Sequence, residues 1–281
     1  MLFPENIGSH LSIDEVALSK GELYTILSNK SGKGKKGTIV ACIAGTKAED
    51  IIQVLRKIPI KQRKLVKEVT LDMAPNMALA TQESFPMARL VTDRFHVVRL
   101  ALEAVQQIRT YFRWEEMDIE NQQIKDAKNR KEKHSHSILS NGDTPKQLLA
   151  RSRYILAKKE SQWTKNQKQR AQILFAKYPS IQIAYRHVIK LRAIYEEANH
   201  LNGLIKLQKW INETRILDIK QFNSVANSIE NHFDTILNFF YLRSTNANAE
   251  SFNAKIKLFR ANLRGVVDTK FFLFRLTKLF A

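Results

Sequence analysis

The strongest constraint on the fold is a change in hydrophobic period about a third of the way along the chain. Before Asp93, short runs of strand length alternate with helical stripes and turn residues, whereas from Asp93 onward nearly every segment has helical period. Five runs have the length and composition of strands, at residues 10–14, 22–28, 38–44, 68–72 and 88–92. This order predicts a mixed α/β unit followed by an all-α block.

Two helices are predicted between these strands. Thr46 and Glu49 have the spacing of a capping box, and Pro59 ends the apolar stripe that follows them. Pro75 opens a second helix that reaches about Ser84. Helices therefore fill the connections into the fourth and fifth strands.

The all-α block begins with a long amphipathic helix. Its predicted core face carries apolar residues at helical spacing: Phe95, Val98, Leu102, Val105, Ile108 and Phe112. Residues 126–143 lose this period and predict a loop, after which helices resume at Thr144–Pro145 and continue to about residue 242.

Charge narrows the class of partner. The 46 Lys and Arg against 27 Asp and Glu give a net charge of +19, which favours binding to a polyanion such as DNA. A solvated basic surface with no specific partner is the alternative, and the scattered cations do not favour a membrane surface. The predicted phosphate contacts are Lys33, Lys35 and Lys36 in the turn NKSGKGKKG, which also holds Lys30, with Arg151, Arg153, Lys257 and Arg260 elsewhere.

Cysteine use and hydropathy bear on compartment and metal chemistry. The single Cys42 forms no intrachain disulfide and provides no Cys-rich zinc ribbon, so a metal would be held by oxygen or His ligands. We see neither a secretory signal nor an apolar stretch long enough to cross a bilayer, which predicts a soluble, cytoplasmic protein without a membrane partner.

Three acids stand at positions that are chemically useful in such a fold. Asp14 ends the first predicted strand, Asp72 ends the fourth, and Glu250 opens a late helix. In ribonuclease-H-like sheets the first and fourth strands are neighbours, so acids on both can share metal ions. Two Mg²⁺ or Mn²⁺ ions about 3.5–4 Å apart would suit phosphoryl transfer. An ordinary surface or capping role is the alternative for each acid taken singly.

The helix around Glu250 is predicted to have two different faces. Glu250, Asn253 and Lys257 share one face, and apolar side chains at 252, 256 and 259 share the other. One face can pack while the other presents an acid, an amide and a cation.

Several motifs resemble those of bacterial insertion-sequence transposases of the ISL-three group. Within residues 70–109 they are Asp72-Met73, Phe85-Pro86 and Asp93-Arg94-Phe95-His96-Val97. Residues 12–27 and 246–265 are similar to the family's opening strand and to its Glu-x-x-Asn-x-Lys-x-Lys helix, and 151–179 to its inserted helical region. The resemblance runs from about residue 10 to the end of the chain.

The resemblance implies a DDE transposase with a ribonuclease-H-like core. Such an enzyme uses a metal-activated water and then a DNA 3′-hydroxyl in successive strand transfers. Asp14, Asp72 and Glu250 would be its catalytic and metal-binding acids, with two Mg²⁺ or Mn²⁺ ions. Asp93 and His96 match a motif with a supporting role, although Asp93 could instead cap its helix.

Some points stay open. Because neighbours on a strand point to opposite faces, Glu15 could replace or assist Asp14. The implied partners are transposon-end and target DNA and further copies of this chain. Family members commonly carry a zinc-binding and helix-turn-helix segment for which Cys42 cannot supply the ligands. The alternatives are a separately encoded DNA-recognition protein and a truncated remnant.

Two other functional classes compete with the transposase. One is a catalytically inactive or accessory DNA-binding remnant, and the other is a nuclease of the same fold that cuts without joining. The predicted domains are a ribonuclease-H-like core at 8–112, a large all-α insertion at 113–243, and C-terminal helices at 244–281 that complete the core.

Overall fold

The chain folds into two compact units, each of which is described by itself. The computed structural model describes residues 1–18, 21–243, 247–263 and 268–281. The first unit comprises residues 1–97 and 232–281, and the second comprises residues 98–231.

The borders of these units differ from the predicted ones at residues 112 and 243. The first border, between residues 97 and 98, lies inside a continuous helix. The hydrophobic period continues across it, so the sequence pattern does not reveal that the helix changes its packing partner there. The second precedes two short helices that pack back onto the sheet. The predicted C-terminal segment opens at 244–246, which lie outside the described residues.

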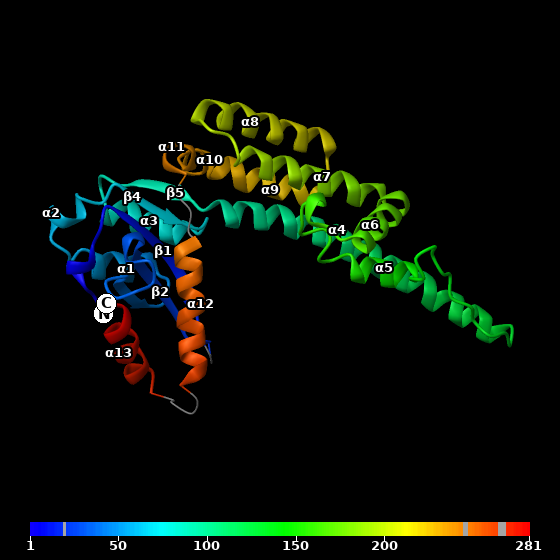
Figure 1. The fold of residues 1–281 in the computed structure, drawn as a ribbon, viewed down its shortest axis with the longest axis horizontal. Coiled ribbons are helices and arrows are strands. Elements are labelled where there is room, and N and C mark those ends of the chain that lie inside the picture. The colour runs from blue at the N-terminus through cyan, green and yellow to red at the C-terminus, as the bar shows by residue number, and fades with distance from the viewer. Residues whose placement is uncertain (19–20, 244–246, 264–267) are drawn as a thin grey trace. The chain divides into compact units, whose positions relative to one another are not determined.

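The first unit is built on a five-stranded mixed sheet (Figure 1). Its strands are β1 (His10–Ala17), β2 (Leu23–Asn29), β3 (Ile39–Ala44), β4 (Glu68–Leu71) and β5 (Arg89–Thr92). All five correspond to predicted strands, and their order across the sheet is β3-β2-β1-β4-β5. β1, β2 and β3 pair antiparallel, whereas β4 lies parallel to both β1 and β5. This is the predicted ribonuclease-H-like α/β fold.

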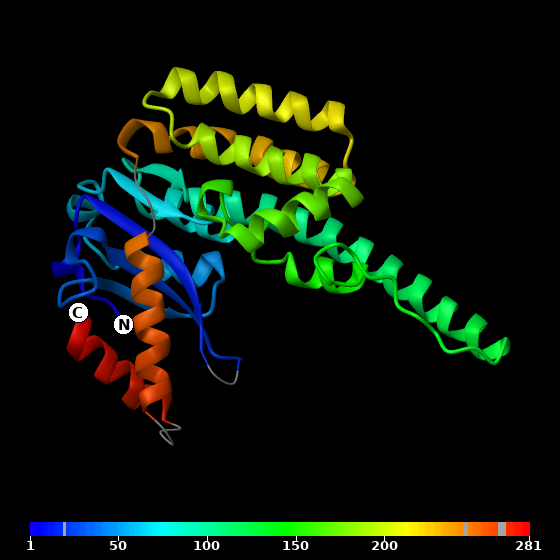
Figure 2. The same cartoon turned by 45° about the vertical axis from the view of Figure 1, so that its right-hand side comes forward.

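Helices cover both faces of this sheet (Figures 1 and 2). On one face, α1 (Ala48–Leu55) and α3 (Pro75–Ser84) pack over apolar side chains of β1 that include Leu11 and Ile13. The other face packs against α12 (Ala247–Asn262) and α13 (Thr269–Phe280) through a second core that includes Val16. Successive β1 residues thus point into different cores, as strand geometry requires.

Smaller elements complete the first unit. The short helix α10 (Phe233–Leu237) contacts β5, where the Thr235 and Thr92 hydroxyls are 2.7 Å apart, and α11 (Phe239–Leu242) follows it. Among its described residues the unit also contains η1 (Pro4–Asn6), η3 (Lys30–Gly32) and α2 (Ile60–Arg63).

The second unit is helical throughout its regular structure. It contains residues 98–129 of α4 (Arg94–Asn129), followed by α5 (Pro145–Arg151), η4 (Glu160–Gln162), α6 (Lys165–Lys177), α7 (Pro179–Ile194), α8 (His200–Leu217) and α9 (Lys220–Asn231). The Thr144 hydroxyl accepts a hydrogen bond from the Gln147 N–H, and the Gln147 side chain accepts one from the Thr144 N–H. This capping box fixes the predicted start of α5.

Three local predictions were wrong. The first helix begins at Ala48 behind Lys47, which makes no side-chain cap, so Thr46 and Glu49 form no capping box. Phe95 is 51% exposed, because small residues such as Ala101 take the buried stripe of α4. The loop predicted from residue 126 starts only after Asn129, since Ala127 is buried and Asp126 accepts a hydrogen bond from Gln122 one turn earlier.

Candidate active site

Strand register places the first two candidate acids next to each other. β1 and β4 are parallel neighbours in which Ser12 pairs with Thr70. Asp14 lies two residues after Ser12, and Asp72 lies two residues after Thr70. The two acids are therefore neighbours at the same end of the sheet. Asp72 directly follows β4, and its Oδ1 accepts a hydrogen bond of 2.9 Å from the Ala74 N–H. That bond orients the carboxylate at the turn that leads into α3.

The alternation of β1 decides between Asp14 and its neighbour Glu15. Asp14 pairs with Ile26, whose side chain belongs to the core beneath α12. Asp14 is partly buried on this face, whereas Glu15 is exposed. Asp14 is therefore the acid of β1 that faces α12.

Helix α12 brings the third acid from the far end of the sequence. Glu250 lies in the first turn of α12, and Phe252 and Ile256 pack into the core below the helix. Asn253 follows one turn after Glu250, and its Nδ2 donates a hydrogen bond of 2.7 Å to Asp14 Oδ2. Helix α12 has both the apolar and the polar face that were predicted. The hydrogen bond from the Asn253 amide links its polar face to β1.

The electrostatics of Asp14 reflect this gathering of acids. The pKa of Asp14 is raised to about 6, chiefly by burial, with smaller contributions from the nearby carboxylates of Asp72 and Glu250. The Glu15 N–H, which donates to Asp14 Oδ1 at 2.9 Å, and His96 oppose that rise in pKa. A carboxylate whose charge is disfavoured by burial and by neighbouring acids suits a site for a multivalent cation.

The motif after β5 lies beside Glu250. Asp93 is buried, and its Oδ2 is 3.5 Å from His96 Nδ1. Asp93, His96 and Glu250 each have a ligand atom within 4.8 Å of the others. The geometry therefore joins the two supporting candidates to Glu250. Lys257, on α12 with Glu250, is exposed.

A comparison with family models identifies the chain. A model described as that of a transposase, for the ISL-three group of DDE enzymes, matches residues 11–276. The chain belongs to this transposase family. Among curated proteins, none matches it. Membership implies a nuclease or strand-transfer enzyme whose substrate is DNA. None of the helices within the described ranges is long and apolar enough to span a bilayer.

The basic turn of this transposase divides into buried and exposed lysines. Lys33, Lys35 and Lys36 are exposed as predicted, in a turn where Gly34 and Gly37 take positive φ angles. Lys30 instead points inward, donates to the Thr70 hydroxyl, and lies 3.1 Å from Glu68 Oε1. Burial lowers the pKa of Lys30, and Glu68 and Asp93 oppose that shift.

Sequence reasoning did not foresee that Lys30 would be partly buried beside Glu68. The sequence offered only a weak indication. Lys30 directly follows β2, whereas the other lysines of the turn come after Gly32.

The remaining predicted phosphate contacts have different surroundings. Arg153 is exposed, but Arg151 pairs with Asp143. Arg260 is only 9% exposed, and its guanidinium lies 3.4 Å from Glu22 and over the Phe272 ring. Arg260 thus links α12 to Glu22, the residue before β2, and to α13, which leaves little of its guanidinium for a phosphate.

Proposed function

We propose that this transposase cleaves and joins DNA strands at insertion-sequence ends, with Asp14, Asp72 and Glu250 as its catalytic acids. The observation that carries the proposal is the proximity of Asp14 to Asp72 and Glu250, whose charges both act on its carboxylate. Parallel pairing of β1 with β4 and the Asn253 bond from α12 account for that proximity.

The donor set fits divalent metal ions of the hard class. Carboxylate oxygens are the ligands that Mg²⁺ and Mn²⁺ prefer, and Asp14, Asp72 and Glu250 offer them from three separate elements. Two such ions, when bound, would supply Lewis-acid stabilisation at the attacking and the leaving oxygens of the phosphodiester. They would also favour the ionised form of Asp14.

The neighbouring side chains position these acids. Asn253 fixes one oxygen of Asp14 and the Glu15 N–H fixes the other, so the orientation of this carboxylate is set before any ion binds. Asp93 and His96 lie beside Glu250, where they would orient that carboxylate or contribute a ligand of their own.

The decisive experiment replaces Asp72 with Asn and measures cleavage and joining in Mn²⁺. The DNA flanking the gene supplies candidate element ends, offered with a separately encoded DNA-recognition protein if one lies upstream. Asp72→Asn removes a charged ligand and keeps the shape of the side chain, so we expect cleavage to fall on the order of 10²–10³-fold. DNA binding at matched salt should change little.

Glu15→Gln is the matched control. It removes an acid one residue from Asp14 whose side chain is exposed. We expect cleavage close to that of the wild type. If Asp72→Asn cleaves as well as Glu15→Gln, the assignment of the acids fails. Wild-type chain that binds the ends but never cleaves them would favour the accessory DNA-binding role, and cleavage without joining would favour a plain nuclease.

A further inference from the structure

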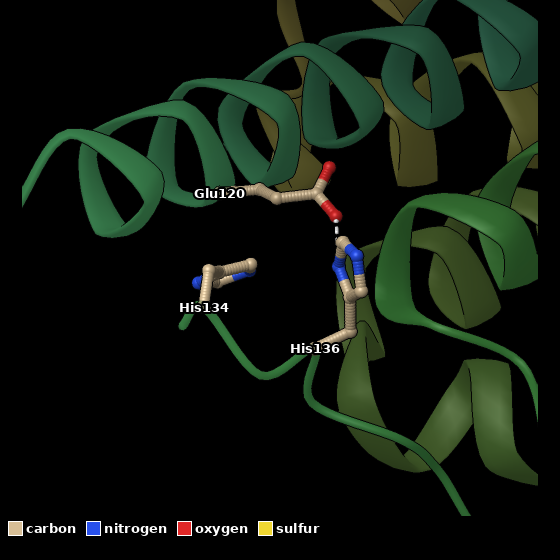
Figure 3. A group of neighbouring side chains, drawn as sticks. All are labelled: Glu120, His134 and His136. Atoms are coloured by element: carbon tan, nitrogen blue, oxygen red, sulfur yellow. Dashed lines mark hydrogen bonds and ion pairs between the residues drawn. The ribbon is translucent and has the colours of Figure 1, made fainter. Parts of the chain in front are cut away.

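A second cluster of metal-ligand type lies in the helical unit, and the proposed transposase chemistry makes no use of it. Glu120 on α4 faces His134 and His136, which belong to the irregular segment between α4 and α5 (Figure 3). One ligand atom from each of the three side chains lies within 4.8 Å of the other two. All three residues fall in the unit formed by residues 98–231.

The two histidines are presented as a pair by the local backbone. They are two residues apart in a segment without helix or strand, and their rings meet edge to face with centroids 4.8 Å apart. His136 Nδ1 lies 2.8 Å from Glu120 Oε1, the contact drawn as a dashed line in Figure 3. The His134 Nε2 is buried and has no hydrogen-bond partner among the described residues.

That buried ring nitrogen is the second observation that points to a ligand. A polar atom removed from water without a partner costs free energy that a metal–nitrogen bond would recover. The segment borders a cavity of about 250 Å³, so the imidazoles have space to reorient. Imidazole nitrogen with one carboxylate oxygen is a donor set suited to Zn²⁺ and related borderline ions, in contrast to the acids around Asp14.

The charge around Glu120 is compatible with such an ion. Lys146 donates to Oε2, and hydrogen bonds from Lys146 and His136 lower the pKa of Glu120. The carboxylate is therefore ionised near neutral pH, and its Oε1 faces the histidines. Bonds of 2.0–2.1 Å in a tetrahedral site space the ligand atoms about 3.3 Å apart. The 2.8 Å contact must open slightly and His134 must move inward.

We propose that Glu120, His134 and His136 bind one Zn²⁺ or similar transition-metal ion, with water in the fourth position. The ion would link the segment between α4 and α5 to α4 itself. It would thereby close a loop formed by the residues from Glu120 to His136. Its role is thus to stabilise the helical unit, separately from the acids that would act on DNA.

The test is zinc binding to the full-length chain by equilibrium dialysis at pH 7.5. All proteins carry Asp72→Asn, which weakens metal binding at the candidate active site. We expect one tightly bound equivalent of Zn²⁺, and Co²⁺ in its place should give the strong visible absorption of a tetrahedral nitrogen and oxygen site. His134→Gln with His136→Gln should weaken binding by at least about a hundredfold.

The control is His200→Gln, which removes an imidazole of the same helical unit at the start of α8. It should leave zinc affinity and the Co²⁺ spectrum unchanged. Circular dichroism checks that each variant is folded, and Zn²⁺ should raise the melting temperature of the control but not of the double variant.

The proposal is overturned by unchanged zinc affinity in the folded double variant, or by the absence of a bound equivalent at about 10 μM Zn²⁺. Neither result bears on the catalytic proposal, because strand cleavage is not the readout.

Discussion

Asp143 of the helical unit and Asp14 of the sheet unit are carboxylates with opposite surroundings. In the helical unit, Asp143 is almost fully buried and is met by two arginines: Arg151 pairs with Oδ1, and Arg170 Nε lies 3.1 Å from Oδ2. In the sheet unit, Asp14 accepts hydrogen bonds from two neutral amides and is surrounded by further acids.

This difference separates structural from functional charge. A buried acid matched by cations of its own chain is already neutralised and helps to hold its surroundings together. A group of acids that raises a member's pKa lacks such compensation, so an external cation can supply it. The contrast is testable, because the same kind of substitution should have opposite effects in the two units.

The largest expected effect on stability follows from removing the paired acid. Asp143→Ala leaves Arg151 and Arg170 without their common partner and empties a buried polar site. We expect the free energy of unfolding to fall by about 3 kcal/mol, measured by urea denaturation at pH 7. Glu132→Ala, in the same unit, removes an acid from an exposed pair with Arg130 and should cost less than about 1 kcal/mol. Equal losses would remove the distinction between buried and exposed pairs.

A second effect concerns acid and the buried His187 of the helical unit. Its ring stacks on Trp210 with centroids 4.4 Å apart, its Nε2 lies 2.6 Å from the Thr214 hydroxyl, and burial lowers its pKa to about 4. Because the folded pKa lies below the ordinary 6.5, the stability from neutral His187 is lost as pH falls from 6.5 to 4. The loss should be on the order of 2–3 kcal/mol.

The measurement compares urea midpoints of the wild type and His187→Gln across that pH range. The variant should be less stable at neutral pH and should lack this part of the acid dependence. Parallel curves for the two proteins would contradict the role given to His187.

A third effect has the opposite sign in the sheet unit. Because the pKa of Asp14 is raised from 3.8 to about 6, its ionisation in the folded state destabilises the metal-free protein as pH rises through that interval. Asp14→Asn keeps an acceptor for Asn253 and removes the charge. In the presence of a chelator at pH 7.5, it should stabilise the chain by on the order of 2 kcal/mol, an advantage that disappears near pH 4.

Thermal unfolding in EDTA, with and without excess Mg²⁺, measures this change. Mg²⁺ should raise the melting temperature of the wild type more than that of Asp14→Asn, since the ion stabilises the ionised acid. A variant less stable than the wild type in EDTA at pH 7.5 would show that Asp14 is not an uncompensated charge.

The smallest expected effect concerns DNA binding, and it compares an exposed cation with one that is already paired. Lys35 is exposed in the basic turn, whereas Arg151 is already paired with Asp143. Lys35→Gln should weaken binding to a DNA duplex by about threefold to fivefold and reduce the slope of log affinity against log salt by about 1, if it neutralises one phosphate. Arg151→Gln should affect stability more than DNA binding. Fluorescence anisotropy over a salt series distinguishes the two, and an unchanged slope for Lys35→Gln would remove it from the interface.

Much of the fold could be predicted because its signals are local. The β-branched runs gave all five strands, and the prolines at 75 and 145 marked the first turns of α3 and α5. The capping pattern at Thr46 was misleading, because the helix starts one residue later than it indicates and without a side-chain cap. The prediction that Phe95 is buried was wrong because the helical period does not show which of two adjacent stripes faces the core.

The sequence by itself determined which residues have the chemistry: the acids at 14, 72 and 250, the amide at 253, and the strongly basic surface. Only the tertiary structure decided which of them meet. Parallel pairing of β1 with β4 set Asp14 beside Asp72, and packing of α12 on the sheet brought Asn253 to Asp14. Tertiary packing also set Lys30 against Glu68 of β4 and Arg260 of α12 against Glu22, while the segment after α4 folded back to place His136 against Glu120. Contacts between distant segments depend on how whole faces pack, and local periodicity carries no information about that.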